Sequence, residues 1–184
     1  MLKNIWGHFK VITRHKFYVM RNCFRAGIPW QGITHDLSKY SPTEFIPGAK
    51  YYQGFRSPNE KEREEVGYST AWMHHKGRNK HHYEYWTDFS VKEHGYRPVP
   101  MPWKYVVEMF CDRVAASKIY YGKDYTDSAA LDYFNMRSDK YKMNLQTAQK
   151  LEFLLMMLAE RGEDETFRFI RSLDKVRGIE PDMV

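Results

Sequence analysis

The stretch Ile33-Thr34-His35-Asp36-Leu37-Ser38-Lys39 is the one around which the chain is organised. Its adjacent His-Asp pair offers an imidazole nitrogen and a carboxylate side by side. A carboxylate can bridge two metal ions, while imidazoles fill their remaining coordination positions. The segment from residue 72 to 82 adds four histidines. We therefore interpret the two segments together as parts of one metal site.

Two further residues have the surroundings expected of metal ligands. His15 has apolar residues three and four positions away on an expected helix, and Asp112 has them three, four and seven positions away on another. Such spacing places both side chains on the apolar side of their helices. A carboxylate that faces an apolar interior is unfavourable unless it is paired or bound to a metal. The surroundings of Asp112 therefore favour a bound cation.

The order of these residues resembles a known superfamily. A histidine, an adjacent His-Asp pair and a distant aspartate, here His15, His35-Asp36 and Asp112, form the pattern of the HD metal-dependent phosphohydrolases. Lys39 matches a lysine that follows the pair in many of them. The resemblance spans roughly residues 8 to 120. It implies an all-α, single-domain helical bundle of HD type.

The histidine-rich segment extends the resemblance. The run His81-His82-Tyr83-Glu84 looks like the His-His-Glu of the HD subgroup that has additional metal-binding histidines, although no Gly-Tyr-Pro follows it. The strings His-Asp-x-Ser-Lys, Ala-Trp-x-His-His and Asn-x-His-His are also similar to a phage and bacterial family of unknown function. That second likeness implies no substrate.

The resemblance implies hydrolysis of a nucleotide or a related phosphate ester by a metal-activated water. On this hypothesis Asp36 bridges two ions and Lys39 stabilises the phosphoryl oxygens. The other expected ligands are His15, His35 and Asp112 for one ion, and His75 and His82 for the other. The expected substrate-binding residues are Lys39, Arg78, Lys80 and Arg113. Imidazole and carboxylate ligands without thiolate suit one or two ions of Mn, Fe, Co, Ni or Zn.

Two alternatives from other classes stay open. Some HD-type relatives use the same ligand arrangement with two irons to activate dioxygen, which implies an oxygenase. A non-catalytic, phage-type binding protein with a basic surface is the other. The net charge of +6 favours an anionic partner, and nucleic acid is one such partner. A homo-oligomer also stays open.

The length and composition bound the class of protein. A chain of 184 residues fits one domain, which we take as 1–184, with the metal site drawn from residues 15–112. Cys23 and Cys111 form no CxxC pair, which indicates free thiols in a reduced compartment. No apolar run approaches the roughly 20 residues that span a bilayer. We therefore expect a cytoplasmic protein.

Hydrophobic periodicity predicts helices along almost the whole chain. Helices are expected over 2–26, from about 30 to before Pro42, from Pro42 onward, up to His75 or Lys76, and over 101–121 and 127–137. Two C-terminal helices within 143–178, ending at Gly162 and Gly178, complete the core. No alternating strand is predicted. The Pro-rich connection at 86–103 is of a length typical of lids, and its aromatic residues either stack on a base or fix the loop.

Overall fold

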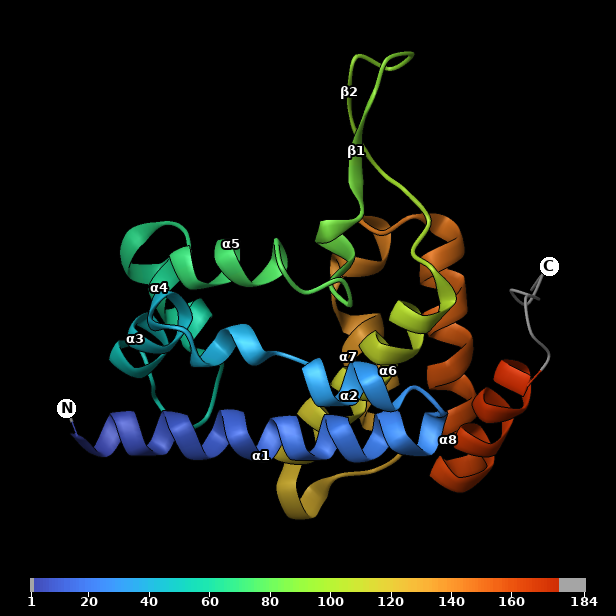
Figure 1. Cartoon of the computed structure of the whole chain (residues 1–184), viewed down its shortest axis with the longest axis horizontal. Helices are drawn as coiled ribbons and strands as arrows, with labels where there is room; N and C mark the ends of the chain where they lie inside the picture. The colour runs from blue at the N-terminus through green and yellow to red at the C-terminus, as the bar shows by residue number, and fades with distance from the viewer. Residues whose placement is uncertain (1, 176–184) are drawn as a thin grey trace.

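The structure is a computed structural model that describes residues 2–175. Within this range there are eight α-helices and one hairpin of two short strands (Figure 1). The helices are α1 (Leu2–Ala26), α2 (Pro29–Thr34), α3 (Pro42–Lys50), α4 (Pro58–Val66), α5 (Thr70–Lys76), α6 (Trp103–Tyr121), α7 (Ala129–Met136) and α8 (Leu145–Lys175). Short 3-10 helices include η1 (Leu37–Tyr40) and η2 (Tyr83–Tyr85). The predicted all-α, single-domain fold is confirmed.

The apolar core lies between α1, α6 and α8. Its fully buried side chains include Val19 of α1, Phe110 of α6 and Leu155 of α8. Cys23 and Cys111 are buried there as free thiols, as expected. Burial of such side chains contributes about 1.5–3 kcal/mol each. None of the described helices combines the length and the apolar character that a transmembrane span requires.

A close approach between α1 and α2 fixes the position of the His-Asp pair. Gly27, with φ of 87°, ends α1 and allows the chain to turn back. A β-carbon on Gly32 would lie 2.8 Å from the β-carbon of Cys23, so only glycine permits this packing. The contact holds the end of α2 against α1. His35, which follows α2 directly, is thereby placed next to His15.

The prediction of one helix from residue 30 to 41 was wrong. The helix ends at Thr34, His35 is extended, and Asp36 has a left-handed conformation with φ of 53° before η1 begins. On a continuous helix, adjacent side chains point about 100° apart. The break allows the His35 and Asp36 side chains to point into the same centre.

Two glycines divide other helical stretches. The single helix expected up to residue 75 or 76 is divided into α4 and α5 by Gly67, which has φ of 89°. Gly162, with φ of 77°, kinks α8 at the place where the sequence predicts a helix end. The predicted end of the last helix, at Val176 and Gly178, lies outside the described residues.

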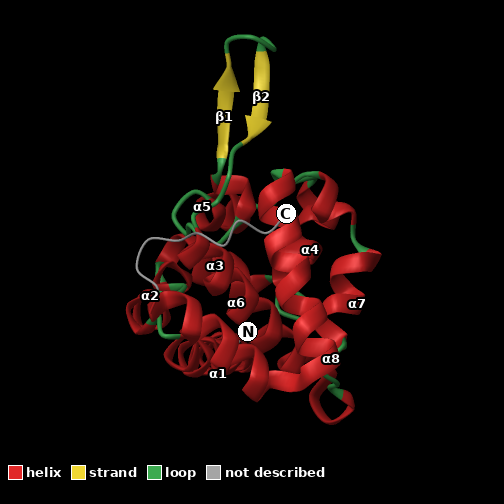
Figure 2. Ribbon diagram, turned by 90° about the vertical axis from the view of Figure 1, so that its right-hand side faces the viewer, coloured by secondary structure: helices red, strands yellow, loops and turns green. Residues whose placement is uncertain are grey.

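The connection at 86–103 contains the one sheet found in the described residues. Strands β1 (Thr87–Ser90) and β2 (Gly95–Pro98) form an antiparallel hairpin, which the sequence did not predict. Phe89 and Tyr96 pair across it, 5.8 Å between ring centroids. The hairpin projects away from the helices (Figures 1 and 2), so this part of the connection does not cover the residues expected to bind metal. Short strands of alternating residues are hard to distinguish from a loop by pattern alone.

Candidate metal centre

The predicted ligands from four separate segments meet at Asp36. His15 Nε2 lies 2.9 Å from Asp112 Oδ1, joining α1 to α6. His35 Nε2 lies 3.3 Å from Asp36 Oδ2, and His75 Nε2 lies 3.3 Å from Asp36 Oδ1. The two carboxylate oxygens of Asp36 therefore face different sets of imidazoles.

Two groups of candidate ligand atoms share this aspartate. In each group the atoms lie within 4.8 Å of one another, a spacing that could hold a metal ion. The first group is His15, His35, Asp36 and Asp112. The second group is Asp36, His75, His81 and His82. A shared carboxylate between two ligand sets is the arrangement expected of a two-ion site.

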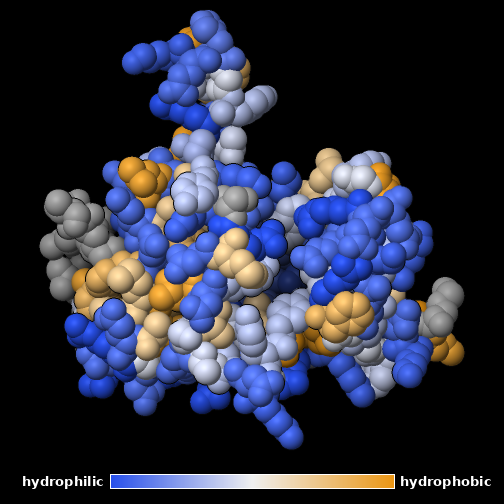
Figure 3. Space-filling model, turned by 180° about the vertical axis from the view of Figure 1, so that it is seen from behind, coloured by the Kyte–Doolittle hydropathy of each residue, from blue (hydrophilic) through white to orange (hydrophobic). Residues whose placement is uncertain are grey.

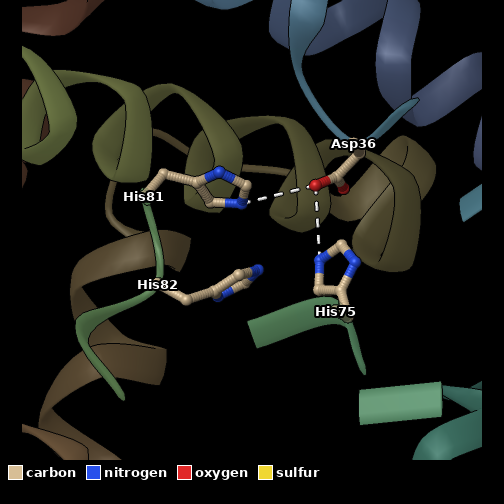
Figure 4. A group of neighbouring side chains, drawn as sticks. All are labelled: Asp36, His75, His81 and His82. Atoms are coloured by element: carbon tan, nitrogen blue, oxygen red, sulfur yellow. Dashed lines mark ion pairs between the residues drawn. The ribbon is translucent and has the colours of Figure 1, made fainter. Parts of the chain in front are cut away.

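His81 joins the centre in addition to the histidines expected from the sequence. It is 1% exposed, and its Nε2 lies 3.5 Å from Asp36 Oδ1. Figure 4 shows His75, His81 and His82 gathered around Asp36. From the sequence, His82 but not His81 was named as a ligand of the second ion. His82 has an extended backbone directly before η2, whereas His81 lies in a turn, and the rings of both residues belong to the second ligand group.

Two glutamates hold the far sides of these imidazoles. Glu108 Oε1 lies 2.9 Å from His35 Nδ1 and 3.2 Å from His81 Nδ1. Glu44 Oε2 lies 2.7 Å from His75 Nδ1. A carboxylate at Nδ1 keeps the proton on that nitrogen and leaves the lone pair on Nε2. Three imidazoles are therefore oriented as metal ligands are.

From the sequence, neither Glu108 nor Glu44 was named as part of the site. A signal for Glu108 was available, because it stands inside the apolar run Val106-Val107-Glu108-Met109-Phe110 and one turn before Asp112. His74 belongs to neither ligand group; its Nδ1 lies 2.6 Å from Glu44 Oε1.

Buried polar atoms without partners support a cation at this place. Nε2 of His35, His75, His81 and His82 makes no hydrogen bond to any described residue. Neither oxygen of Asp36 makes a hydrogen bond to a described residue either, although the carboxylate lies within ion-pair distance of Lys39 and of neighbouring imidazoles. Most buried polar atoms have a hydrogen-bond partner, so each exception needs a reason. One reason would account for all five residues, since each belongs to one of the two groups whose ligand atoms lie close enough together to hold an ion.

The pKa shifts of the buried groups also indicate that positive charge is required in this centre. Burial alone would raise the pKa of Asp36, yet neighbouring His35 and Lys39 hold it well below its usual range. Burial likewise opposes a charge on His35, but Asp36 and Asp112 outweigh it and raise the pKa of His35 well above its usual value. Buried carboxylates thus require positive charge close by, which a protonated imidazole or a metal ion can supply.

Lys39 lies at the accessible edge of the cluster. Its Nζ is 2.6 Å from Asp36 Oδ2, and its side chain is 30% exposed. Burial lowers its pKa, but the carboxylates of Asp36 and Asp112 outweigh burial and raise the pKa of Lys39 to about 12. Seen from behind, the surface is hollowed between the part formed by α3, α4 and α5 and the part formed by α6, α7 and α8 (Figure 3).

The other expected substrate-binding residues are not brought into contact with the centre. Arg78 is exposed on the turn after α5. Lys80 Nζ lies over the rings of Tyr85 and Tyr105, at 5.7 and 5.9 Å from their centroids. The guanidinium of Arg113 lies over Phe134. Among residues 2–175, no hydrogen bond or ion pair joins any of the three to the candidate ligands, so their roles stay predictions.

Comparison with known proteins gives one match. No curated protein and no solved structure is similar to the chain. Residues 4–157 match the family described as "Family of unknown function (DUF5662)". This range includes every candidate ligand from His15 to Asp112. Since the match covers most of the length of the chain, the chain belongs to this family of unknown function.

Proposed function

We propose that this protein is a metal-dependent phosphohydrolase that cleaves a nucleotide or a related phosphate ester. The observation that carries the proposal is the pair of ligand groups that share Asp36, with the ammonium of Lys39 beside the shared carboxylate. The order of His15, His35-Asp36 and Asp112 also supports membership of the HD superfamily. Both arguments concern the same buried cluster.

The donor set fits divalent transition metals. His15, His35 and Asp112 would hold one ion and His75, His81 and His82 the other, with Asp36 between them. Nitrogen and oxygen donors without thiolate favour Mn, Fe, Co, Ni or Zn. Such ions, when bound, activate water at neutral pH and neutralise charge on a phosphoryl group.

The residues of the chain orient and complete this chemistry. Glu108 and Glu44 hold three imidazoles in fixed tautomers through Nδ1. Lys39 carries a full positive charge, since its pKa is raised to about 12. At the exposed edge of the cluster, that ammonium would pair with a phosphoryl oxygen of the substrate. A preorganised cation of this kind is a strong source of catalysis.

Metal analysis followed by a phosphate-release screen tests the proposal. The wild-type protein, purified without added metal, should contain transition metal and release phosphate from at least one nucleotide or phosphate ester. The Asp36→Ala and Asp112→Ala variants should lose both properties. His75→Ala should lose both properties as well, and its matched control His94→Ala should retain both, because His94 is exposed on the hairpin loop.

Other outcomes would overturn this proposal or favour a different function. Metal content unchanged in Asp36→Ala and Asp112→Ala would overturn the metal-centre proposal. Bound iron with strictly oxygen-dependent turnover, without phosphate release, would favour a di-iron oxygenase. Salt-sensitive binding of nucleic acid that survives His35→Ala and Asp36→Ala would favour a non-catalytic binding protein.

A further inference from the structure

The net charge of the chain lies entirely in its first 35 residues. Residues 1–35 contain six lysines and arginines and no aspartate or glutamate. The whole chain has 29 basic and 23 acidic residues, so the remaining residues have 23 of each and are balanced. The charge of +6 is therefore a property of α1, which contains all six of these residues, and not of the whole surface.

Four of these six basic residues face solvent from one side of α1. Lys16 is used within the fold, since it donates to the carbonyls of Ile33 and His35. Arg25 is paired with Glu163 and Asp164. The other four follow one another at spacings of seven, four and seven, which is one helical face. They are Lys3, Lys10, Arg14 and Arg21, all exposed and without an ion pair to a described carboxylate.

A row of exposed aromatic side chains runs beside this basic face. Trp6, Phe17 and Phe24 are 58%, 58% and 51% exposed on the outer side of α1. Trp30 of α2 and Leu37 of η1, on the elements next to α1, are 70% and 53% exposed. Scattered exposed apolar residues are ordinary, but a row of large ones along one helix marks an interaction surface.

Cations and rings are in contact along this face. Lys10 Nζ lies 5.1 Å from the ring centroid of Trp6, and the Arg14 guanidinium lies 5.4 Å from that of Tyr18. The helices that pack on α1 cover its opposite side, where His15 faces the metal centre. In Figure 1, α1 runs along the lower side of the molecule, and the hairpin projects from the upper side. Among the described residues, the basic and aromatic side chains named above therefore lie on the side of α1 that the packed helices leave exposed.

We propose that this face, defined by Lys3, Lys10, Arg14, Arg21, Trp6, Phe17 and Phe24, binds an anionic phospholipid surface. Basic side chains would meet the headgroups, and the rings would lie at the boundary with the acyl chains, as in interfacial amphipathic helices. Duplex nucleic acid, whose bases are stacked inside the helix, would satisfy the four cations but leave the row of apolar side chains in water. A single-stranded oligonucleotide, whose bases can stack on aromatic rings, is therefore a separate outcome of the experiment. The proposal does not depend on the phosphohydrolase assignment.

Vesicle flotation with the full-length protein tests this proposal. The wild-type protein should float with vesicles of phosphatidylcholine containing about 30 mol% phosphatidylglycerol and remain unbound with phosphatidylcholine alone. Binding should weaken as salt rises from about 0.05 to 0.5 M, because the Debye length shortens. This salt series needs no variant and therefore no assumption about folding.

Two sets of variants separate the charge from the rings. Each basic residue near an anionic surface contributes about five-fold to partitioning, so Lys10→Glu, Arg14→Glu and Arg21→Glu together should weaken binding at least a hundredfold. Lys92→Glu, Arg97→Glu and Lys142→Glu make the same charge change at exposed positions outside α1, and they should have little effect. Trp6→Ala, Phe17→Ala and Phe24→Ala together should also weaken vesicle binding. They should leave binding to heparin, a soluble polyanion that tests the basic residues alone, unchanged.

Three results would overturn the proposal. The first is equal binding to neutral and anionic vesicles, or binding to neither. The second is equal loss of binding in the α1 variant and its charge-matched control. The third is that the protein does not bind vesicles and uses this face for another partner. That partner would be an oligonucleotide, or a second copy of the chain if the protein is a dimer that the aromatic variant dissociates.

Discussion

Glu108 supports two candidate ligands at once, because its Oε1 faces Nδ1 of both His35 and His81. Removing its charge by Glu108→Gln should free both imidazoles to change tautomer and orientation. Loss of such an outer partner typically costs about 10–100-fold in metal affinity. Competition with a chromophoric chelator would measure the change.

The control for this variant is Glu152→Gln, a glutamate on α8 whose side chain is 37% exposed. It makes the same chemical change without touching an imidazole and should leave the affinity unchanged. If Glu108→Gln and the wild type had equal metal affinity, His35 and His81 would not need this carboxylate in order to bind metal.

Lys39 should act on the reaction rather than on metal loading. Its ammonium is 2.6 Å from Asp36 Oδ2, and its side chain reaches the exposed edge of the centre. Lys39→Met should retain bound metal and lower kcat by about 10²–10³, as removal of one preorganised donor does in other enzymes. Steady-state kinetics and metal analysis on the same sample would test both parts.

Lys39→Arg provides the comparison, since it keeps the charge but changes its shape. It should fall between wild type and Lys39→Met. If Lys39→Met instead lost metal but kept its kcat per bound ion, the lysine would serve to assemble the centre and not to catalyse the reaction.

At the scale of the element, helical periodicity predicted α1 at its observed bounds and α6 within two residues of its start. The positions at which the helices are interrupted could be predicted only in part. Gly162 was expected to end a helix because glycine takes a positive φ readily. Asp36 takes a positive φ without being glycine, and no local pattern shows this. Its conformation costs about 1 kcal/mol, which the contacts of the buried carboxylate must offset.

Glu163, directly after the kink in α8, ties three helices together. It is paired with Arg25 of α1 at 2.6 Å and with Lys118 of α6. Burial raises its pKa, but these hydrogen bonds outweigh burial and leave the pKa of Glu163 below its usual value. Glu163→Gln should therefore destabilise the fold by about 1–2 kcal/mol at neutral pH, measured by urea unfolding.

The pH dependence of this effect has a defined sign. A carboxylate whose pKa is lowered in the folded state stabilises above its unfolded pKa of about 4.3, and this contribution is lost as the pH falls through the folded pKa. The difference between wild type and Glu163→Gln should disappear in that acid range. Glu165→Gln, which removes an exposed pair with Arg161, should change stability by less than about 0.5 kcal/mol at any pH. A pH-independent difference would contradict the ionic explanation.

At the scale of the whole molecule, the candidate site is a convergence of segments far apart in sequence. His15, the His35-Asp36 pair and Asp112 could be predicted because each is a polar residue on an apolar helical face, or part of a motif. That both His81 and His82 join the centre could not be predicted, since it depends on the backbone path between α5 and η2. Glu108 shares its oxygen between two rings from different segments, and only the packed structure brings those rings together.

The convergence predicts that metal binding stabilises the entire fold. An ion that binds the assembled centre and not the unfolded chain adds RT ln(1 + [L]/Kd), about 2.7 kcal/mol at a hundredfold excess over Kd. For a chain of this size that is a rise in Tm of roughly 5–10 °C. Differential scanning fluorimetry of chelator-treated protein, with and without added Zn²⁺ or Mn²⁺, would measure it. Asp36→Ala should show no metal-dependent rise.

Protons compete with the ion for the same nitrogens, which sets how this rise depends on pH. The pKa of His35 is raised in the fold, so without metal its protonated form stabilises the protein fully below the unfolded pKa of about 6.5, and this is lost as the pH rises through the folded value. Metal ligands must be deprotonated, so binding expels this proton. The metal-dependent rise in Tm should therefore grow from pH 6 to pH 8. A rise that is constant over that range, or equally large in Asp36→Ala, would place the bound ion somewhere other than among these imidazoles.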